Sequence, residues 1–330
     1  AGADGDIAAG VEEANASLEQ IERLNEDIAK ASVAGRDATA LLDERDRLVN
    51  RINEFIPVRP LTRENGRIDL ITNEGVLLLT GTARAIEFTP SPIVTASASL
   101  ANGALSGLSV EGVDITPGAG ARAPSAGAFA GLFAVRDEIV PKAASELDAL
   151  AEDLINRFQA PGLDPTLAPG APGLFTDAGA ALAPPVAIGL SGRLSLNAAV
   201  DPAQGGASWR LRDGLGAAAP GPIAANALLR DLVSVLDAPI AGSLGGGRAL
   251  TALEAAGELS ASAGADRTAF DAAFQASESY AAALGEAELQ ETGVDTDAEL
   301  QSLIVIEEAY AANARLIETV GRLVERLLEI

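Results

Sequence analysis

The chain has 330 residues, with 47 acidic and 23 basic side chains, so its formal net charge is −24, and it contains no His, Cys or Met. This composition excludes disulfides, thiolate and imidazole metal ligands, and the Ser-His-Asp and Cys-His catalytic arrangements. The acidic balance argues against binding to nucleic acid, because few cations are available to neutralise phosphates. Aromatic residues make up only 3% of the chain and apolar residues 48%. Burial by Ala, Leu, Val and Ile favours helix–helix packing over a pocket lined by rings.

The sequence predicts neither membrane insertion nor a cleaved secretory signal. No stretch of about 18 uninterrupted apolar residues occurs, and the first residues lack the basic and apolar regions of a signal peptide. The chain also begins without Met. We therefore expect Ala1 to be a processed end or a cut inside a longer protein.

Residues 1–56 predict a helical hairpin that forms part of a rod. Apolar residues alternate at spacings of four and three from Ile7 onward, which is typical of a coiled-coil seam. Gly35 interrupts the pattern, and Pro57 stops the second helix. The residues expected in this N-terminal seam are Val11, Leu18, Ile21, Asn25 and Ile28. Asn25 is interpreted either as a buried polar residue that fixes register or as a solvent-facing one.

Residues 57–124 predict a β-rich region, because the period of the pattern changes from about 3.5 to 2. Asn65-Gly66 is typical of a two-residue hairpin turn, and 73–75 is a second turn candidate. The expected strands are 67–72, 76–80 and 84–89, and 93–115 is a further candidate. Residues 116–127 are rich in Pro, Gly and Ala and form a connection.

The second half begins with a long helix at 125–160, in which Pro141 predicts a kink. Residues 161–250 predict an inserted domain rich in Pro, Gly and Ala. Its candidate elements are short strands at 193–197 and 207–212, a helix at 222–238 and a loop at 239–250. Residues 251–330 predict two long rod helices, and Thr296 with Glu299 forms a capping box at the start of the second.

The last helix carries the most regular pattern of the sequence. Two sets of residues, each spaced by seven, lie three positions apart and make one stripe that is apolar except for one Asn. We interpret this stripe as an assembly interface. Its members are Leu303, Ile306, Tyr310, Asn313, Ile317, Val320, Val324 and Leu327.

These elements together predict a mainly α fold with an inserted β-containing region, of the α+β type. Its architecture would be a long coiled-coil-like helical rod plus an inserted mixed domain.

No motif in the sequence predicts catalysis, a cofactor or a metal. Gly245-Gly246-Gly247 is followed by Arg248-Ala249 rather than by the Lys-Ser/Thr pair of a phosphate loop. The alternating acids at 295, 297 and 299 lack the Gly and the distal Glu of a Ca²⁺ loop, and a helix cap explains them. A general acid–base pair among 47 acids stays open, but no pair is singled out.

Three blocks of the sequence resemble one family, the bacterial flagellar hook-associated protein 1 family, whose members are also called hook–filament junction proteins. The first block contains Asn15, Asn25 and the run 41–49, where Asp43 and Arg47 are spaced as a surface ion pair. The second contains 127–132, Arg136-Asp137 and Leu147-Asp148. The third, from 293 to 328, is similar to the C-terminal segment of flagellar axial proteins. The resemblance covers about 11–330, is weak over 57–124 and 177–287, and omits the family's N-terminal helix.

The resemblance implies a structural component of the bacterial flagellum, which forms the junction between hook and filament by helical subunit assembly. The implied partners are further copies in a ring, the hook protein, the second junction protein and an export chaperone. It implies an extracellular location, reached through the flagellar type III apparatus. The alternatives are another axial protein, such as the second junction protein or a flagellin, and a cell-wall hydrolase with a carboxylate pair in 160–250.

Overall fold

The computed structural model describes residues 2–242, 244–292 and 296–328, and among these the side chains of 291, 292, 296, 298 and 323–328 are not described. The chain divides into two compact units, Ala1–Ala261 and Ser262–Ile330. The fold is mainly α with an inserted β region, as the sequence predicts. The division of the chain into the five predicted regions 1–56, 57–124, 125–160, 161–250 and 251–330 stays a prediction.

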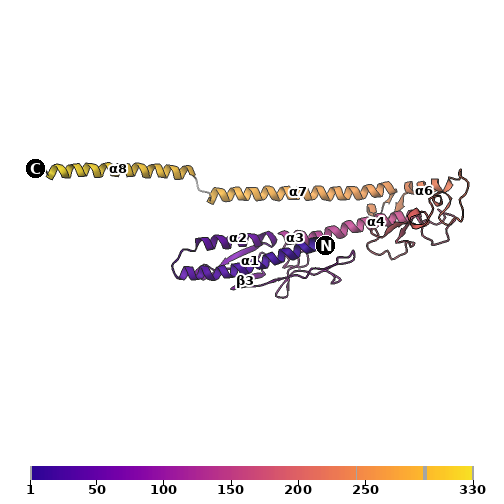
Figure 1. The fold of residues 1–330 in the computed structure, drawn as a ribbon, viewed down its shortest axis with the longest axis horizontal. Coiled ribbons are helices and arrows are strands. Elements are labelled where there is room, and N and C mark those ends of the chain that lie inside the picture. Colours follow the sequence, from indigo (N-terminus) through magenta and orange to yellow (C-terminus); the bar gives the residue numbers. More distant parts are fainter. Residues whose placement is uncertain (1, 243, 293–295, 329–330) are drawn as a thin grey trace. The chain divides into compact units, whose positions relative to one another are not determined.

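The first unit begins with a helical hairpin of α1 (Gly2–Val33) and α2 (Thr39–Phe55), which lie side by side in Figure 1. Gly35 adopts a φ of +62°, a conformation that Gly reaches without steric cost, so the chain can reverse here. Pro57 lies two residues after the end of α2. Both interruptions lie where the sequence predicts them.

Two small antiparallel sheets follow the hairpin. The first has the order β1-β2-β3-β4 and the second the order β5-β6-β7. Their strands are β1 (Val58–Thr62), β2 (Ile68–Thr72), β3 (Leu77–Thr80), β4 (Thr82–Ala83), β5 (Ile86–Glu87), β6 (Ser109–Val110) and β7 (Val113–Asp114).

The turn at Asn65-Gly66 is longer than the predicted two-residue hairpin. Strand pairing ends at Thr62 opposite Ile68, so residues 63–67 form the loop. Asn65 and Gly66 both have positive φ, +58° and +76°, as the predicted turn requires. The extra length comes from a 3₁₀ turn, Glu64–Gly66.

A third helical segment joins the two halves of the first unit. It consists of α3 (Ala128–Ala134), a π-helical stretch η2 (Val135–Ile139) and α4 (Val140–Phe158). Pro141 lies in the first turn of α4. Its ring cannot accommodate the carbonyl four residues earlier, and a π-bulge just before it is the local solution. The predicted kink is thus an insertion of π-helix that begins six residues before the proline.

The main core of the first unit lies between α1, α2, α3 and the two sheets. Val11, Leu18 and Ile21 of the N-terminal seam belong to this core, so α1 packs against several elements rather than against one coiled-coil partner. Gly10 lets α1 lie close to α3, because a Cβ there would lie 2.9 Å from the Phe129 ring. The Phe129 ring stacks on Phe55 with centroids 5.5 Å apart.

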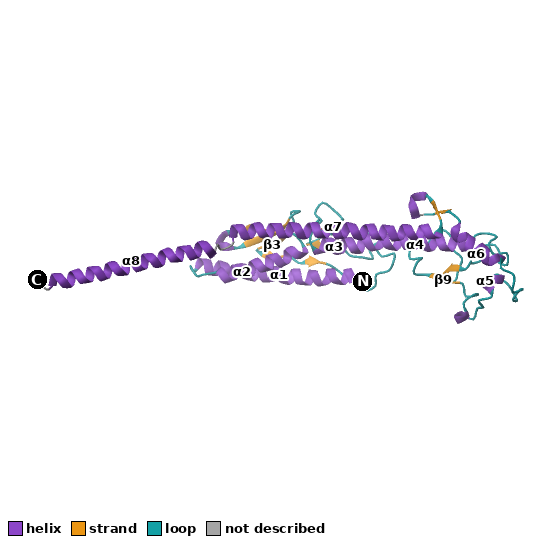
Figure 2. Ribbon diagram, turned by 90° about the horizontal axis from the view of Figure 1, so that it is seen from above, coloured by secondary structure: helices purple, strands orange, loops and turns teal. Residues whose placement is uncertain are grey.

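Residues 161–250 consist mostly of loops around short elements, which Figure 2 shows near the C-terminal end of α4. The elements are β8 (Phe175–Asp177), β9 (Leu194–Leu196), α5 (Arg210–Asp213), α6 (Ala227–Asp237), β10 (Ile240–Ala241) and β11 (Ala249–Leu250). The strand predicted at 207–212 is wrong. This stretch turns into the single helical turn α5, which Gly214 ends with a φ of +110°. The loop predicted at 239–250 contains the β10–β11 hairpin instead.

Two long helices end the chain, α7 (Ala252–Thr292) and α8 (Thr296–Leu328). The second unit consists of α8 and the part of α7 that follows Ala261. None of the helices in the described parts of the chain is both long and apolar enough to cross a membrane.

Candidate assembly surface

The stripe of α8 is exposed to solvent along its described length. Leu303, Ile306, Tyr310, Ile317 and Val320 are each more than half exposed, and Asn313 is exposed between them. Val324 and Leu327 lie outside the residues whose side chains are described. Spacings of three and four place these residues on one face of a helix. A helix in water gains most of its stability by burying such a face, and the described residues of this unit leave the face more than half exposed.

The helix α7 adds exposed apolar side chains that the sequence patterns do not single out. Phe270, Phe274, Tyr280, Leu284 and Leu289 are all more than half exposed. Phe270 with Phe274, and Tyr280 with Leu284, are spaced by four and so are neighbours on the helix surface. This spacing of four could have identified the exposed apolar face of α7 from the sequence, but the many Ala residues around the pairs make the periodicity hard to recognise.

The N-terminal seam has the opposite environment. Val11, Leu18, Ile21, Asn25 and Ile28 are all less than one tenth exposed. Apolar residues of α2, α3 and the sheets cover the first three of them within the same chain. In the described unit this seam therefore supports the shape of the domain and offers no surface to another chain.

Asn25, the polar residue of that seam, is buried because its side-chain amide forms hydrogen bonds with the backbone of a strand. It is 4% exposed, donates from Nδ2 to the Ile68 carbonyl at 2.8 Å, and accepts the Ile68 N–H at 3.1 Å. Asn15 makes the same pair of hydrogen bonds with Ile86, at 2.9 and 2.8 Å. Each side-chain amide thus stands in for a neighbouring strand. Asn25 is therefore the buried residue of the two interpretations, and its role in fixing register stays a prediction.

A buried ion pair joins the start of α1 to the π-helical stretch. Arg136 Nη1 lies 2.9 Å from Asp4 Oδ1, and the guanidinium also binds Asp137 and donates to the Ser106 carbonyl. Burial alone would lower the pKa of Arg136, but its hydrogen bonds to Asp137 and Asp4 raise it above the ordinary value. Arg136 therefore stays charged, and four hydrogen bonds from its guanidinium offset the cost of burial.

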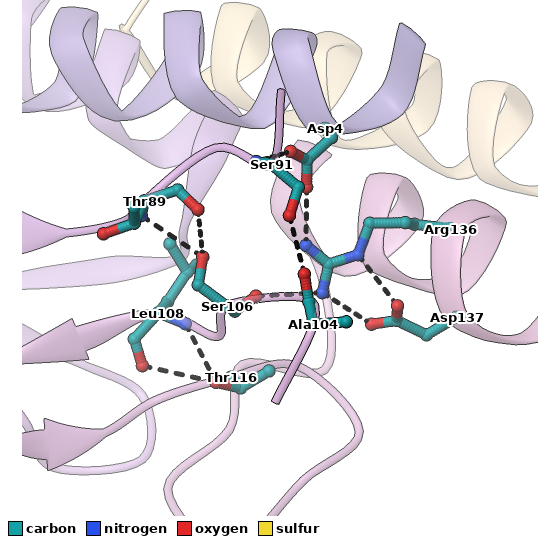
Figure 3. A network of polar contacts seen from close by, with 9 residues as sticks. All are labelled: Asp4, Thr89, Ser91, Ala104, Ser106, Leu108, Thr116, Arg136 and Asp137. Atoms are coloured by element: carbon teal, nitrogen blue, oxygen red, sulfur yellow. Dashed lines mark hydrogen bonds and ion pairs between the residues drawn. The ribbon is translucent and has the colours of Figure 1, made fainter. Parts of the chain in front are cut away.

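Figure 3 shows how this ion pair organises the loops around it. The Ser91 N–H donates to Asp4 Oδ2 at 2.6 Å, and Ser91 Oγ donates to the Ala104 carbonyl at 2.6 Å. Ser106 Oγ donates to the Thr89 carbonyl at 2.6 Å. Because these loops have little regular structure, the polar network supplies the order that strand pairing does not.

Two more residues of the resembling blocks lie at junctions. Arg45 is buried and donates from Nη1 to the Gly66 carbonyl at 2.7 Å. Asp148 accepts the N–H of Gly189 at 2.6 Å and the N–H of Ser191 at 2.8 Å. The ion pair predicted between Asp43 and Arg47 is absent from the described contacts. Arg47 pairs instead with Glu44, at 2.9 Å.

A third buried arginine holds the far end of α4. Arg157 is 0% exposed and pairs with Asp153 at 2.6 Å. Its other N–H groups donate to the carbonyls of Val235, Ala238 and Leu250. No sequence pattern singles out this residue, because an Asp and an Arg spaced by four usually form an exposed pair.

The described residues hold no group of acids arranged to bind a metal ion. The Gly245-Gly246-Gly247 run forms a short 3₁₀ turn, Leu244–Gly247, and Arg248 beside it pairs with Glu258 at 3.5 Å. Of the acids at 295, 297 and 299, Asp295 lies outside the described residues.

The fold and the exposed helices define a class of protein. A helical hairpin that carries small sheets is followed by long helices with exposed apolar faces, and this arrangement is typical of proteins that pack against other chains. Comparison with known families then identifies the particular one. The model of the flagellar hook-associated protein FlgK helical domain matches residues 1–173, more than half of the chain. The chain belongs to this family.

A solved structure is also similar to the chain. It is the flagellar hook junction protein FlgK from Burkholderia pseudomallei, with 24% sequence identity and a TM-score of 0.38. The match covers 53% of this chain and 31% of that protein, so the chain spans about a third of its length. No curated protein matches the chain.

Proposed function

We propose that the chain is a structural component of the bacterial flagellum and forms part of the junction between hook and filament by helical subunit assembly. The observation that carries this proposal is the exposed apolar stripe of α8, in a chain whose first half belongs to the flagellar hook-associated family.

The energetics of the stripe favour assembly. Each of its five described apolar side chains is more than half exposed, and covering one of them contributes on the order of 1–2 kcal/mol. A series of such contacts along one face suits packing against other helices, as in a bundle or a coiled coil. The exposed Asn313 would then sit at a seam position, where a polar residue selects register and partner.

The proposed partners follow from the same role. They are further copies of the chain in a ring, the hook protein on one side, the second hook–filament junction protein on the other, and an export chaperone that covers the C-terminal helix before assembly. The proposed location is the extracellular flagellum, reached through the flagellar type III apparatus. Support comes from the family and from helical faces that a chaperone could cover before export.

We propose no enzymatic activity. The hydrolase alternative requires a carboxylic acid of raised pKa beside a second carboxylate. Asp213 and Asp231 line one shallow hollow in 160–250. A hydrogen bond from Arg212 lowers the pKa of Asp213, which is the wrong direction for a general acid. The alternative of another axial protein is disfavoured by the family match over 1–173.

The test uses two isoleucines of α8 with the same exposure. Ile304 and Ile306 are each 55% exposed, but two helical positions separate them by about 200° around the axis, so only Ile306 lies on the stripe. Ile306→Glu should abolish swimming and leave the protein unassembled, because assembly would bury a charge. Ile304→Glu should swim normally.

The two purified variants should have equal helix content by circular dichroism, since both positions are exposed in the isolated chain. If both variants swim normally, or both fail to the same degree, the stripe is not the assembly surface.

A further inference from the structure

The sequence Asn-Gly occurs twice in the chain, at Asn65-Gly66 and at Asn102-Gly103. Both pairs lie in loops of the first unit. An Asn that precedes Gly is prone to lose its side-chain amide in water, because Gly has no Cβ to shield its nitrogen from the Asn side chain. The two sites share this sequence and differ in what surrounds them.

We propose that Asn65 is a site of spontaneous deamidation in the folded protein and that Asn102 is protected from it. Hydroxide removes the proton of the Gly66 nitrogen, which then attacks Cγ of Asn65 and forms the new N–Cγ bond. The Cγ–Nδ2 bond breaks as Nδ2 takes a proton from water and leaves as ammonia. Water then opens the cyclic imide. Attack at Cγ gives Asp, and attack at the main-chain carbonyl carbon gives isoaspartate, in which Gly66 is joined through the side chain.

Asn102 is held by three hydrogen bonds to the backbone. Its Oδ1 accepts the N–H groups of Ser99 and Ala104, both at 3.1 Å, and its Nδ2 donates to the Ser97 carbonyl at 2.7 Å. The Gly103 N–H itself donates to the Leu100 carbonyl at 3.1 Å. Ring closure at this site must break several of these bonds, so the fold opposes it.

Asn65 has none of these restraints. Its side chain is exposed and makes no hydrogen bond to any described residue. Its φ of +58° is an uncommon conformation for a residue with a Cβ and costs about 1 kcal/mol. No side-chain hydrogen bond has to break when Asn65 rotates into the conformation needed for ring closure. Leaving the positive φ also relieves local strain.

Isoaspartate at position 65 would disturb a buried contact. The Gly66 carbonyl accepts the 2.7 Å hydrogen bond from Arg45, whose Nε is buried without a partner. A Cβ added to Gly66 would lie 3.0 Å from Ile28 of α1, so the loop has little room to shift. The extra main-chain methylene of isoaspartate would displace this carbonyl and leave the Arg45 charge less satisfied.

The experiment measures both sites in one sample. The purified full chain is incubated at 37 °C and mildly alkaline pH, then digested, and each Asn-Gly peptide is followed by mass spectrometry as a shift of about +1 Da. A second sample is kept in guanidinium chloride. We expect the Asn65 peptide to convert in the folded chain while the Asn102 peptide does not, and both to convert at similar rates in the denatured chain.

Asn65→Gln is the matched control, because Gln would need a larger, slower-forming ring. It should lose the conversion and the isoaspartate, which a carboxyl methyltransferase specific for isoaspartyl residues detects. The aged natural chain should melt at a lower temperature than fresh protein, whereas aged Asn65→Gln should not. Equal conversion of the two sites in the folded chain, faster conversion at Asn102, or conversion of neither site folded when both convert denatured would overturn the proposal.

Discussion

Replacing Asn25 by Leu tests whether the first sheet is fixed to α1 by a side-chain amide. Asn and Leu have side chains with the same number of heavy atoms and the same branch at Cγ, so Leu is the closest apolar replacement in shape. It removes the two hydrogen bonds to Ile68, at 2.8 and 3.1 Å. The Ile68 N–H and carbonyl then remain in a site where Asn25 is 4% exposed and water is largely excluded.

The expected loss of stability follows from these two bonds. Each contributes about 1 kcal/mol net, and a buried polar group left without a partner costs about 1–3 kcal/mol. The gain from a buried apolar side chain offsets part of this loss. Asn25→Leu should therefore reduce the free energy of unfolding of the first unit by about 2–4 kcal/mol, which is large for a single substitution.

Urea unfolding followed by circular dichroism measures the change, with Asn50→Leu as the control. Asn50 lies on the exposed side of α2, so its substitution should change stability by less than about 0.5 kcal/mol. If Asn25→Leu is as stable as Asn50→Leu, the amide does not hold the sheet, and apolar packing alone positions β2.

Two further predictions concern α4. Arg157→Met should leave Asp153 and three carbonyls without their buried partner, a loss of about 3–5 kcal/mol, and limited proteolysis should then cut 227–250 early while 1–134 resists. Burial alone would raise the pKa of Asp148, but hydrogen bonds from Ser191 and from the neighbouring backbone amides lower it below the ordinary value of 3.8. Its contribution to stability is therefore present above that ordinary value and lost as the pH falls through the lower, folded-state value. Thermal melts of the natural chain and of Asp148→Asn should differ at neutral pH and converge in acid.

The helices of the chain were largely predictable because their signals are local. Apolar spacing identifies α1 and α2, and the interrupters Gly35 and Pro57 lie within two residues of the observed helix ends. The described part of α8 begins at Thr296, where the sequence places the start of the last helix, and the capping box itself stays a prediction. Propensity, periodicity and chain breakers all favour the same structure in these segments, and such agreement makes prediction reliable.

The sheets were less predictable because tertiary contacts hold them. β5, β6 and β7 have two residues each, too few to show any alternation. Asn15 supplies β5 with hydrogen bonds from α1, and Glu22 accepts the Ala83 N–H in the same way at 2.7 Å. A sequence pattern does not show that polar residues of a helix serve as the neighbour of a strand.

The buried arginines were missed for a related reason. Arg45, Arg136 and Arg157 each lie on helical segments among other charged residues, where a charge is normally solvated. Each is buried because it donates hydrogen bonds to backbone carbonyls of segments far away in the chain. Only the resemblance to known proteins gave Arg45 and Arg136 any prominence, and nothing did so for Arg157.

The helices α1 and α8 carry almost the same pattern and have opposite environments. Both repeat apolar residues at spacings of three and four, and each places one Asn in the series, Asn25 and Asn313. Asn25 is buried and bound to a strand, whereas Asn313 is exposed. A periodic apolar face indicates that other residues must pack on the helix, but it does not indicate whether they come from the same chain or from another. In α1 the same chain supplies the cover, so the face builds a domain, and in α8 the face remains available for the assembly that we propose.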